Sequence, residues 1–388
     1  MSDGTTPIDP AALRPHYAAF LEGGSGSRIL LTGHSHQAWP DVAREGLLQA
    51  FADAATHVDD KWGAAMEVAG ALRARVARWL GGKAEDVALA QSSHELLFRF
   101  LSALDWTKRR HLVTSDGEFH SQSRQLRRLE ETGLVEVTRV PALPLASLAG
   151  RLAAAVREDT IALLCSTVLF ETASIVPGLE EACEAAHRVG AEVLLDGYHH
   201  QNIVPWRPVD PQAFVTGGGY KYAQWGEGCC FMRVPPGCTL RPVHTGWFAD
   251  FGGLSGDQSG PVGYGDTGGS RFMGSTYDPV SHYRARRVSE FFDEHDLSVA
   301  RLRELSLRQT GRLIAGLHTE TILTPLDEER RGGFVTIQVE GAPEVARRMR
   351  QKGVYVDARR DRLRFGPAPY TTDEELDEGV RRFRECVP

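Results

Sequence analysis

Short apolar runs alternate with amphipathic segments through the middle of the chain. The runs have the length of strands and contain few polar residues: 87–90, 111–114, 134–140, 161–166 and 192–195. Between them, apolar residues recur at helical spacing in 96–104, 121–132, 145–156 and 179–189. Strands that alternate with helices predict an α/β fold, whose mainly parallel sheet is sandwiched between helices.

The two ends of the chain follow a different pattern. Helical spacing predicts helices at 10–22, 42–55 and 64–80, and an apolar run predicts a strand at 28–32. Beyond residue 279, predicted helices (279–295, 299–317, 343–351, 373–384) mix with short strands (334–339, 354–357, 363–365). We therefore expect a large domain at 61–280, a small α+β domain at 281–388, and an N-terminal segment, 1–60, that packs on the small domain.

Composition narrows the class of protein. Of the 388 residues, 42% are hydrophobic and 24% are charged, as in an ordinary globular enzyme. The net charge of −7 argues against a nucleic-acid surface. No segment has the pattern of a signal peptide or a membrane span, so we expect a cytoplasmic protein with no membrane partner. The six cysteines form no C-x-x-C pair, and no metal site is predicted.

Several residues that could carry chemistry come directly after predicted strands. They are Ser92, Phe119, Thr167 and Asp196. In mainly parallel sheets, ligands bind beyond the carboxyl ends of the strands. The pattern therefore predicts one site that is assembled from several strand ends.

Lys221 has unusual surroundings for a lysine. The chain has five lysines, and only this one lies among glycines and aromatic residues, in the sequence Gly217-Gly218-Gly219-Tyr220-Lys221-Tyr222. The glycines predict a turn after the apolar run 213–215, where the backbone can approach a bulky group closely. Loss of water around an amine lowers its pKa and makes it a nucleophile towards an aldehyde.

These residues fit the requirements of pyridoxal 5'-phosphate. Its ring nitrogen needs a carboxylate, which Asp196 would supply, and Phe119 could stack on the ring. Ser92 and Ser93 precede an apolar helix, whose N-terminus could bind the phosphate. Structural explanations are also open, because Ser92 with Glu95 fits a capping box and Asp196 could cap a helix.

Longer motifs extend this pattern over almost the whole chain. They are DGYH at 196–199, GYKY at 219–222, GEG at 226–228, GWF at 246–248, the segment 271–276 and RFGPAPY at 364–370. With these motifs the chain resembles the class V aminotransferase group of fold-type-I pyridoxal-phosphate enzymes, and within that group the kynureninases. The resemblance implies the fold-type-I architecture, a seven-stranded type of sheet and a homodimer.

The resemblance also implies roles for individual residues. Lys221 would bind the cofactor's aldehyde and move protons, and Asp196 would pair with the ring nitrogen. The other cofactor-binding residues would be Ser92, Ser93, Phe119, Thr167, His199, Tyr220, Trp247 and Thr276, with Trp247 and Thr276 reaching the neighbouring subunit's phosphate. Arg364 would bind the substrate's α-carboxylate, and His34 and Ser35 would also contact the substrate.

The activity implied by the resemblance is hydrolysis of the Cβ–Cγ bond of kynurenine, or a related aryl-keto amino acid, in tryptophan catabolism. The products would be an anthranilate-type acid and L-alanine. The alternatives are a class V aminotransferase and a C–S lyase or desulfurase. Two positions depart from the kynureninase pattern: the segment 33–37 reads GHSHQ where GNSLG is typical, and Gln122 stands where an acid is usual.

Overall fold

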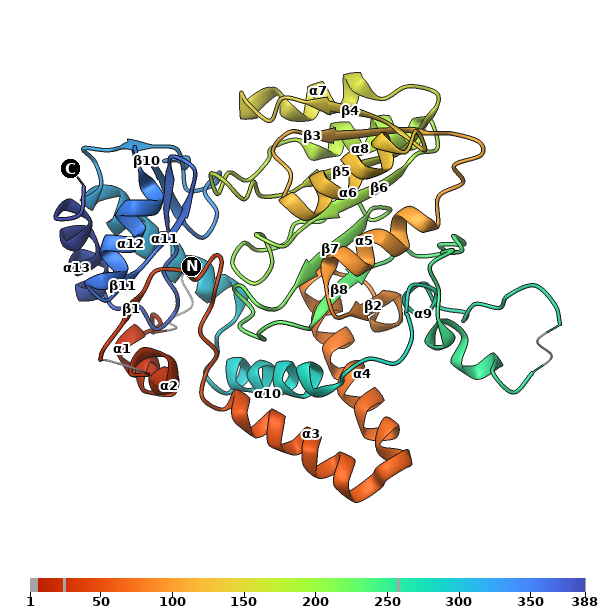
Figure 1. Ribbon diagram of the computed structural model, residues 1–388, viewed down its shortest axis with the longest axis horizontal. Helices are drawn as coiled ribbons and strands as arrows, with labels where there is room; N and C mark the ends of the chain where they lie inside the picture. The colour runs from red at the N-terminus through yellow and green to blue at the C-terminus, as the bar shows by residue number, and fades with distance from the viewer. Residues whose placement is uncertain (1–5, 24–25, 257–258, 388) are drawn as a thin grey trace.

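A computed structural model describes residues 6–23, 26–256 and 259–387. Its centre is a seven-stranded sheet with the order β2-β8-β7-β6-β5-β3-β4. The strands are β2 (Val87–Ala90), β8 (Cys230–Arg233), β7 (Phe214–Gly218), β6 (Glu192–Asp196), β5 (Thr160–Ser166), β3 (His111–Ser115) and β4 (Glu136–Val140). Only β8 runs against its neighbours within this sheet, so the sheet is mainly parallel, as predicted (Figure 1).

Both faces of the sheet are buried, which explains why its strands read as continuous apolar runs. On one face, Val193 and Leu195 of β6 pack in a core with α4 (Lys61–Leu80), α7 (Leu148–Ala155) and α8 (Leu179–Arg188). On the other face, Leu194 and Phe214 pack with α5 (Ser93–Ser102) and α6 (His120–Glu131). Alternate residues of one strand thus serve two cores.

The C-terminal unit contains a second, antiparallel sheet. Its order is β12-β13-β10-β9, from β12 (Asp357–Arg359), β13 (Arg362–Phe365), β10 (Val335–Gln338) and β9 (Thr321–Ile322). The helices of this unit are α11 (Val299–Gly316), α12 (Ala342–Gln351) and α13 (Asp373–Arg384). The sequence did not predict β9, which has only two residues. Thr372 and Glu375 form a reciprocal capping box at the start of α13.

The N-terminal segment joins this C-terminal unit. Strand β1 (Ile29–Leu30) pairs in parallel with β11 (Val354–Tyr355). The helix predicted at 10–22 is divided into α1 (Pro10–Leu13), a 3-10 turn at Arg14–Tyr17 and α2 (Ala18–Leu21). Pro15 lies in that turn and has no N–H to continue an α-helix. The predicted domain boundaries remain predictions.

The turn predicted at the three glycines is wrong, because β7 continues through Gly217 and Gly218. These positions need glycine for space rather than for a turn. A Cβ atom at Gly217 would overlap the ring of Phe231, and one at Gly219 would lie 2.5 Å from Trp225. The close approach is therefore between β7 and side chains of the same chain.

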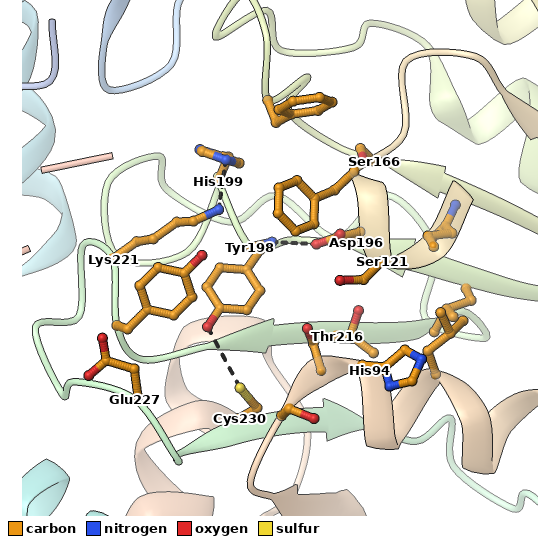
Figure 2. Close-up of a pocket in the computed structure, with 18 of the residues that line it drawn as sticks. His94, Ser121, Ser166, Asp196, Tyr198, His199, Thr216, Lys221, Glu227 and Cys230 are labelled. Carbon is orange, nitrogen blue, oxygen red and sulfur yellow. Dashed lines mark hydrogen bonds between the residues drawn. The ribbon is translucent and has the colours of Figure 1, made fainter. Parts of the chain in front are cut away.

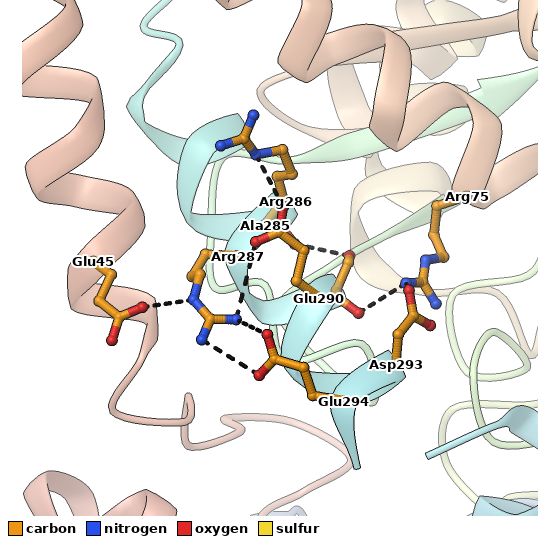
Figure 3. A network of polar contacts seen from close by, with 9 residues as sticks. Glu45, Arg75, Ala285, Arg286, Arg287, Glu290, Asp293 and Glu294 are labelled. Atoms are coloured by element: carbon orange, nitrogen blue, oxygen red, sulfur yellow. Dashed lines mark hydrogen bonds and ion pairs between the residues drawn. The ribbon is translucent and has the colours of Figure 1, made fainter. Parts of the chain in front are cut away.

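Helix α3 (Ala43–His57) packs against α10 (Val280–Glu294), which in turn contacts α4. Arg287 of α10 links the first two helices, with Nε 2.6 Å from Glu45 of α3 and Nη1 2.9 Å from Glu294 (Figure 3). Arg75 of α4 pairs with Asp293 of α10. The carboxylates of these ion pairs are exposed to water, so we assign the stability of the contact mainly to packing. No helix within the described ranges is both long and apolar enough to cross a membrane.

The contact between α3 and α10 can be tested with a pair of glycines. A Cβ atom at Gly46 would lie 2.6 Å from the carbonyl oxygen of Tyr283, whereas one at Gly70 of α4 would meet nothing within 4 Å. We expect Gly46→Ala to lower the free energy of unfolding by about 1–3 kcal/mol. Gly70→Ala should raise it by about 0.5–1 kcal/mol, because alanine favours helix. Urea denaturation measures both, and a stabilised Gly46→Ala would contradict the close packing.

Candidate active site

A cavity of about 310 Å³ lies beyond the carboxyl ends of β5 and β6 (Figure 2). Seven of the predicted site residues line it: Ser92, Ser93, Phe119, Asp196, His199, Tyr220 and Lys221. They come from the ends of β2, β3, β6 and β7. The sheet therefore brings together residues that are more than a hundred positions apart, as expected for ligands at strand ends.

Lys221 is the buried basic group of the cavity. Its Nζ atom is hydrogen-bonded to Nε2 of His199 at 2.7 Å. The centroids of the Phe119, Tyr198 and Tyr220 rings lie 5.5, 4.5 and 5.5 Å from Nζ. Burial lowers the pKa of Lys221 to about 7, although Asp196 acts to raise it. At neutral pH a substantial fraction of this amine is therefore uncharged and nucleophilic.

His199 complements the lysine. Burial lowers its pKa well below the usual range, and the charge of Lys221 acts in the same direction. A neutral imidazole can form a hydrogen bond with the amine without adding a second positive charge beside it. Its Nδ1 atom is buried and has no hydrogen-bond partner among the described residues.

Asp196 ends β6 with its side chain at the cavity. Its Oδ1 atom accepts a hydrogen bond from the N–H of Tyr198 at 2.8 Å, so it also caps the following turn. The backbone N–H of Thr167 donates to the Asp196 carbonyl at 2.9 Å, which holds the ends of β5 and β6 together. Burial raises the pKa of Asp196 and Lys221 lowers it. The capping role and a role in binding are compatible, because the carboxylate has a second oxygen.

The N-terminus of α5 opens on the same cavity. The Ser92 Oγ atom accepts from the N–H of Glu95 at 3.2 Å. In the predicted capping box, the Glu95 carboxylate would bind back to the start of the helix. It pairs with Arg99 instead. Ser93 and His94 also line the cavity. A helix N-terminus with two hydroxyl groups is a site for a phosphate.

Glu118, which the sequence did not indicate, contacts the cavity wall through Ser166. Its two carboxyl oxygens are hydrogen-bonded to the Ser115 and Ser166 hydroxyls, both at 2.5 Å. Burial raises its pKa to about 7. Ser166 lines the cavity and lies opposite Asp196 in the pairing of β5 and β6. An acid directly before Phe119 at a strand end is the signal that could have identified it.

Gln122, which stands at the usual acidic position, also lines the cavity. Its amide nitrogen donates to the Thr114 hydroxyl at 3.3 Å, so the side chain is tied to β3. A neutral amide leaves this wall of the cavity without the negative charge that an acid would bring.

The structure places three residues predicted to contact the substrate behind the cavity wall. Arg364 is buried, donates to the Phe170 carbonyl at 2.6 Å and pairs with Asp357. His34 is fully buried and stacks on Phe334 with ring centroids 4.5 Å apart. The Ser35 hydroxyl donates to the Thr32 carbonyl at 3.3 Å.

Three predicted cofactor-binding residues also lie off the cavity wall. Trp247 donates from Nε1 to the Thr276 hydroxyl at 3.1 Å and stacks on Phe248 at 4.2 Å. Both Trp247 and Thr276 are exposed and are not among the residues that line this chain's own cavity. The Thr167 hydroxyl donates to the Asp196 carbonyl at 3.2 Å, which gives Thr167 a supporting position.

Comparisons with known proteins find similarity to kynureninases. The sequence profile described as "Kynureninase C-terminal domain" matches residues 302–383. Kynureninase of Pseudomonas fluorescens is 26% identical over 333 residues, which cover 81% of this chain and 77% of that protein. Kynureninase of Geobacillus thermodenitrificans is 24% identical, over 60% of this chain and 56% of its own length. The chain is thus similar to kynureninases, in agreement with the resemblance that its motifs indicate.

Solved structures of related enzymes share the fold. The cystine C–S lyase C-DES, in complex with cysteine persulfide, has a TM-score of 0.81 at 16% identity and covers 93% of this chain and 98% of its own. The cysteine desulfurase CsdA of Escherichia coli has a TM-score of 0.79 at 14% identity and covers 98% and 99%. These structures confirm the predicted fold-type-I architecture, and one of them, a C-DES mutant, carries glycine covalently linked to its pyridoxal-phosphate cofactor. The cavity fits this cofactor, because it presents a buried amine, a buried carboxylate and a helix N-terminus.

The depressed pKa of Lys221 predicts a specific dependence of stability on pH. The unfolded lysine titrates near 10.5 and the folded one near 7, so the free energy of unfolding rises with pH between these values. Lys221→Met removes this dependence. We expect the variant without cofactor to be more stable than the wild type at about pH 6, and this advantage to shrink towards about pH 9.

Urea denaturation at the two pH values measures the difference. Lys83→Met is the matched control, because the Lys83 side chain is 76% exposed. An advantage of Lys221→Met that does not change with pH would show that burial does not lower the pKa of this amine.

Proposed function

We propose that the protein is a pyridoxal-phosphate hydrolase that cleaves the Cβ–Cγ bond of kynurenine or a related aryl-keto amino acid. The products are an anthranilate-type acid and L-alanine. The observation that carries the proposal is the match of kynureninases to most of the chain, together with the kynureninase profile over residues 302–383. That profile includes Arg364 and Asp357, so it covers the region that we propose binds the substrate.

The residues of the cavity would hold the cofactor by complementary chemistry. Ser92, Ser93 and the N-terminus of α5 would bind the phosphate, and Asp196 would bind the ring nitrogen. Phe119 would lie against the ring, and Lys221 would bind the aldehyde carbon. The bound cofactor supplies an electron sink that weakens bonds to the substrate's α-carbon. A carboxylate at the ring nitrogen sustains that property, because it keeps the nitrogen protonated.

Lys221 is the group that we propose moves protons during the reaction. A pKa of about 7 matches the working range of a general acid and base. His199 holds the amine at 2.7 Å and orients it. Both groups are buried, so protons that Lys221 transfers stay within the site rather than exchanging with water.

Arg364 is our candidate for binding the substrate's α-carboxylate. Its guanidinium is buried, and the cation would form two parallel hydrogen bonds with a carboxylate. The carbonyl of Phe170, a residue of the cavity wall, accepts from Arg364 and links it to the cavity. In this arrangement a substrate carboxylate competes with Asp357 or shares the arginine with it.

His34 and Ser35 would recognise the substrate from the N-terminal segment. Burial lowers the pKa of His34, and Arg364 adds to this effect, so the imidazole is neutral at pH 7. Neither ring nitrogen has a hydrogen-bond partner within the described residues, and Nε2 lies 3.6 Å from Asp357. A buried imidazole with an unmet hydrogen-bonding capacity favours a role in recognition.

We further propose a homodimer with the site at the subunit interface. Trp247 and Thr276 are hydrogen-bonded to each other and exposed, away from the cavity of their own chain. Phe251, which is 55% exposed, continues the aromatic surface of Trp247. A second copy of the chain would cover this surface and receive the two side chains at its phosphate.

A C–S lyase is the second candidate, because the solved structures with this fold include a cystine C–S lyase. The desulfurase variant of this chemistry requires a mobile cysteine. Here five cysteines are buried, and the sixth, Cys238, is partly buried with a pKa raised to about 11. These thiols are poorly suited to nucleophilic attack.

Three substrates distinguish the candidates. The purified protein loaded with pyridoxal phosphate should release fluorescent anthranilate from kynurenine, and Lys221→Ala should not, because it lacks the amine. Incubation with cystine tests for persulfide, and a keto acid with an amino donor tests for amino transfer. Formation of anthranilate supports the hydrolase. Persulfide without anthranilate would instead indicate a C–S lyase, and amino transfer without anthranilate would indicate an aminotransferase.

Arg364 provides a second test. We expect Arg364→Ala to lower kcat/KM for kynurenine by about 10–100-fold, mainly through KM, because a charged hydrogen bond to the substrate is lost. Arg312→Ala removes an arginine of the small unit that pairs with Asp377 and is 41% exposed, and should leave kcat/KM unchanged. Unchanged KM in Arg364→Ala, with a native circular dichroism spectrum, would exclude Arg364 from carboxylate binding.

A further inference from the structure

Tyr198 lines the cavity close to Asp196 and Lys221, the residues proposed to hold the cofactor's ring. It stands between Asp196 and His199 in the turn after β6, and its N–H donates to the Asp196 carboxylate at 2.8 Å. Its side chain lines the cavity and is only 8% exposed in total. One turn therefore places the acid, this ring and the imidazole that binds Lys221.

The ring of Tyr198 is the nearest of the three aromatic rings around the lysine. Its centroid lies 4.5 Å from Nζ of Lys221, against 5.5 Å for Phe119 and for Tyr220. The Tyr220 ring packs on it with centroids 5.2 Å apart. Figure 2 shows the ring beside the lysine, with the phenol group directed away from it towards β8. A flat ring in this position is a wall for another aromatic ring.

The hydroxyl group of Tyr198 lies in a space beside Gly218 and Cys230. The hydroxyl lies 3.6 Å from the Cys230 Sγ atom on β8. A Cβ atom at Gly218 would overlap that hydroxyl and lie 2.6 Å from the Cys230 sulfur. Gly218 lies within strand β7 and is not a position of positive φ, so its backbone does not need glycine. Glycine is required here because the tyrosine side chain takes the space.

We propose that Tyr198 is a cofactor-positioning residue whose ring forms a wall of the pyridoxal-phosphate site, and that Gly218 and Cys230 fix this ring. The inference rests on the proposed function, because it takes the same cofactor in the same cavity. The ring contributes stacking area, while the backbone N–H of the same residue orients the acid proposed for the ring nitrogen. Tyr198 would thus help to orient the cofactor ring beside Lys221.

Two substitutions of Tyr198 separate the ring from its hydroxyl. We expect Tyr198→Ala to weaken binding of pyridoxal phosphate about tenfold and to reduce the visible circular dichroism of the bound cofactor. Tyr198→Phe keeps the ring and should restore both properties to within about twofold of the wild type. Absorbance titration measures binding. Wild-type affinity and dichroism in Tyr198→Ala, with unchanged unfolding of the cofactor-free protein, would overturn the proposal.

A double-mutant cycle tests whether the space beside Gly218, here called the recess, holds the Tyr198 side chain in place. Gly218→Ala should displace the ring and reproduce the loss in Tyr198→Ala, and the double variant should be no worse than either single one. Gly217→Ala is the control, because a Cβ there meets Phe231 and Gln201, and its effect should add to that of Tyr198→Ala. Additive effects at Gly218 would overturn the assignment of the recess.

The two proposals fail in different ways. If the wild type binds pyridoxal phosphate and forms anthranilate while the Tyr198 variants behave like it, only the role of Tyr198 is lost. If the wild type binds the cofactor but cleaves cystine instead, the role of Tyr198 stands and the hydrolase is lost. If the wild type does not bind the cofactor, both are lost.

Discussion

The site depends on the burial of one amine, that of Lys221. Lys221 is buried among aromatic rings, and its hydrogen-bond partner is an imidazole rather than a carboxylate. Isolation of a charged amine in such surroundings is unfavourable, so the equilibrium shifts towards the neutral form. The surrounding residues maintain this state: His199 stays neutral because it is buried beside the lysine, and Asp196 is close enough to moderate the shift but is held by the turn that it caps.

The burial of this amine requires a rigid frame, and the sheet supplies it. Strands β6 and β7 are covered on both faces, so their carboxyl ends cannot shift without disturbing two cores. The turn after β6 and the turn after β7 then meet at fixed distances. The small residues of β7 let side chains of neighbouring elements pack directly against its backbone.

Sequence patterns predicted the sheet and the grouping of residues at its strand ends because the information there is local. Each strand reads as an apolar run, and Asp196 or Ser92 follows its strand directly. The region proposed to bind the substrate could not be derived in this way. Arg364, Asp357, His34 and Phe334 come from four separate segments, and their contacts exist only after the small unit has folded. Glu118 was missed for a related reason, since its partner Ser166 lies on another strand. A turn was wrongly predicted at the glycines of β7, because glycine is favoured both in turns and where space is short.

The pairing of β1 with β11 also affects when the region proposed to bind the substrate can assemble during synthesis of the chain. The central sheet is built from residues 87–233, which are contiguous in the chain and can associate as soon as they leave the ribosome. The loop that carries His34 is synthesised before all of them, yet β1, which precedes it, gains its partner only with Val354 and Tyr355. The Thr32 bridge to Gly366 follows later still. The contacts that fix the loop of His34 therefore form only when the last segment of the chain has been made, after the strands of the central sheet.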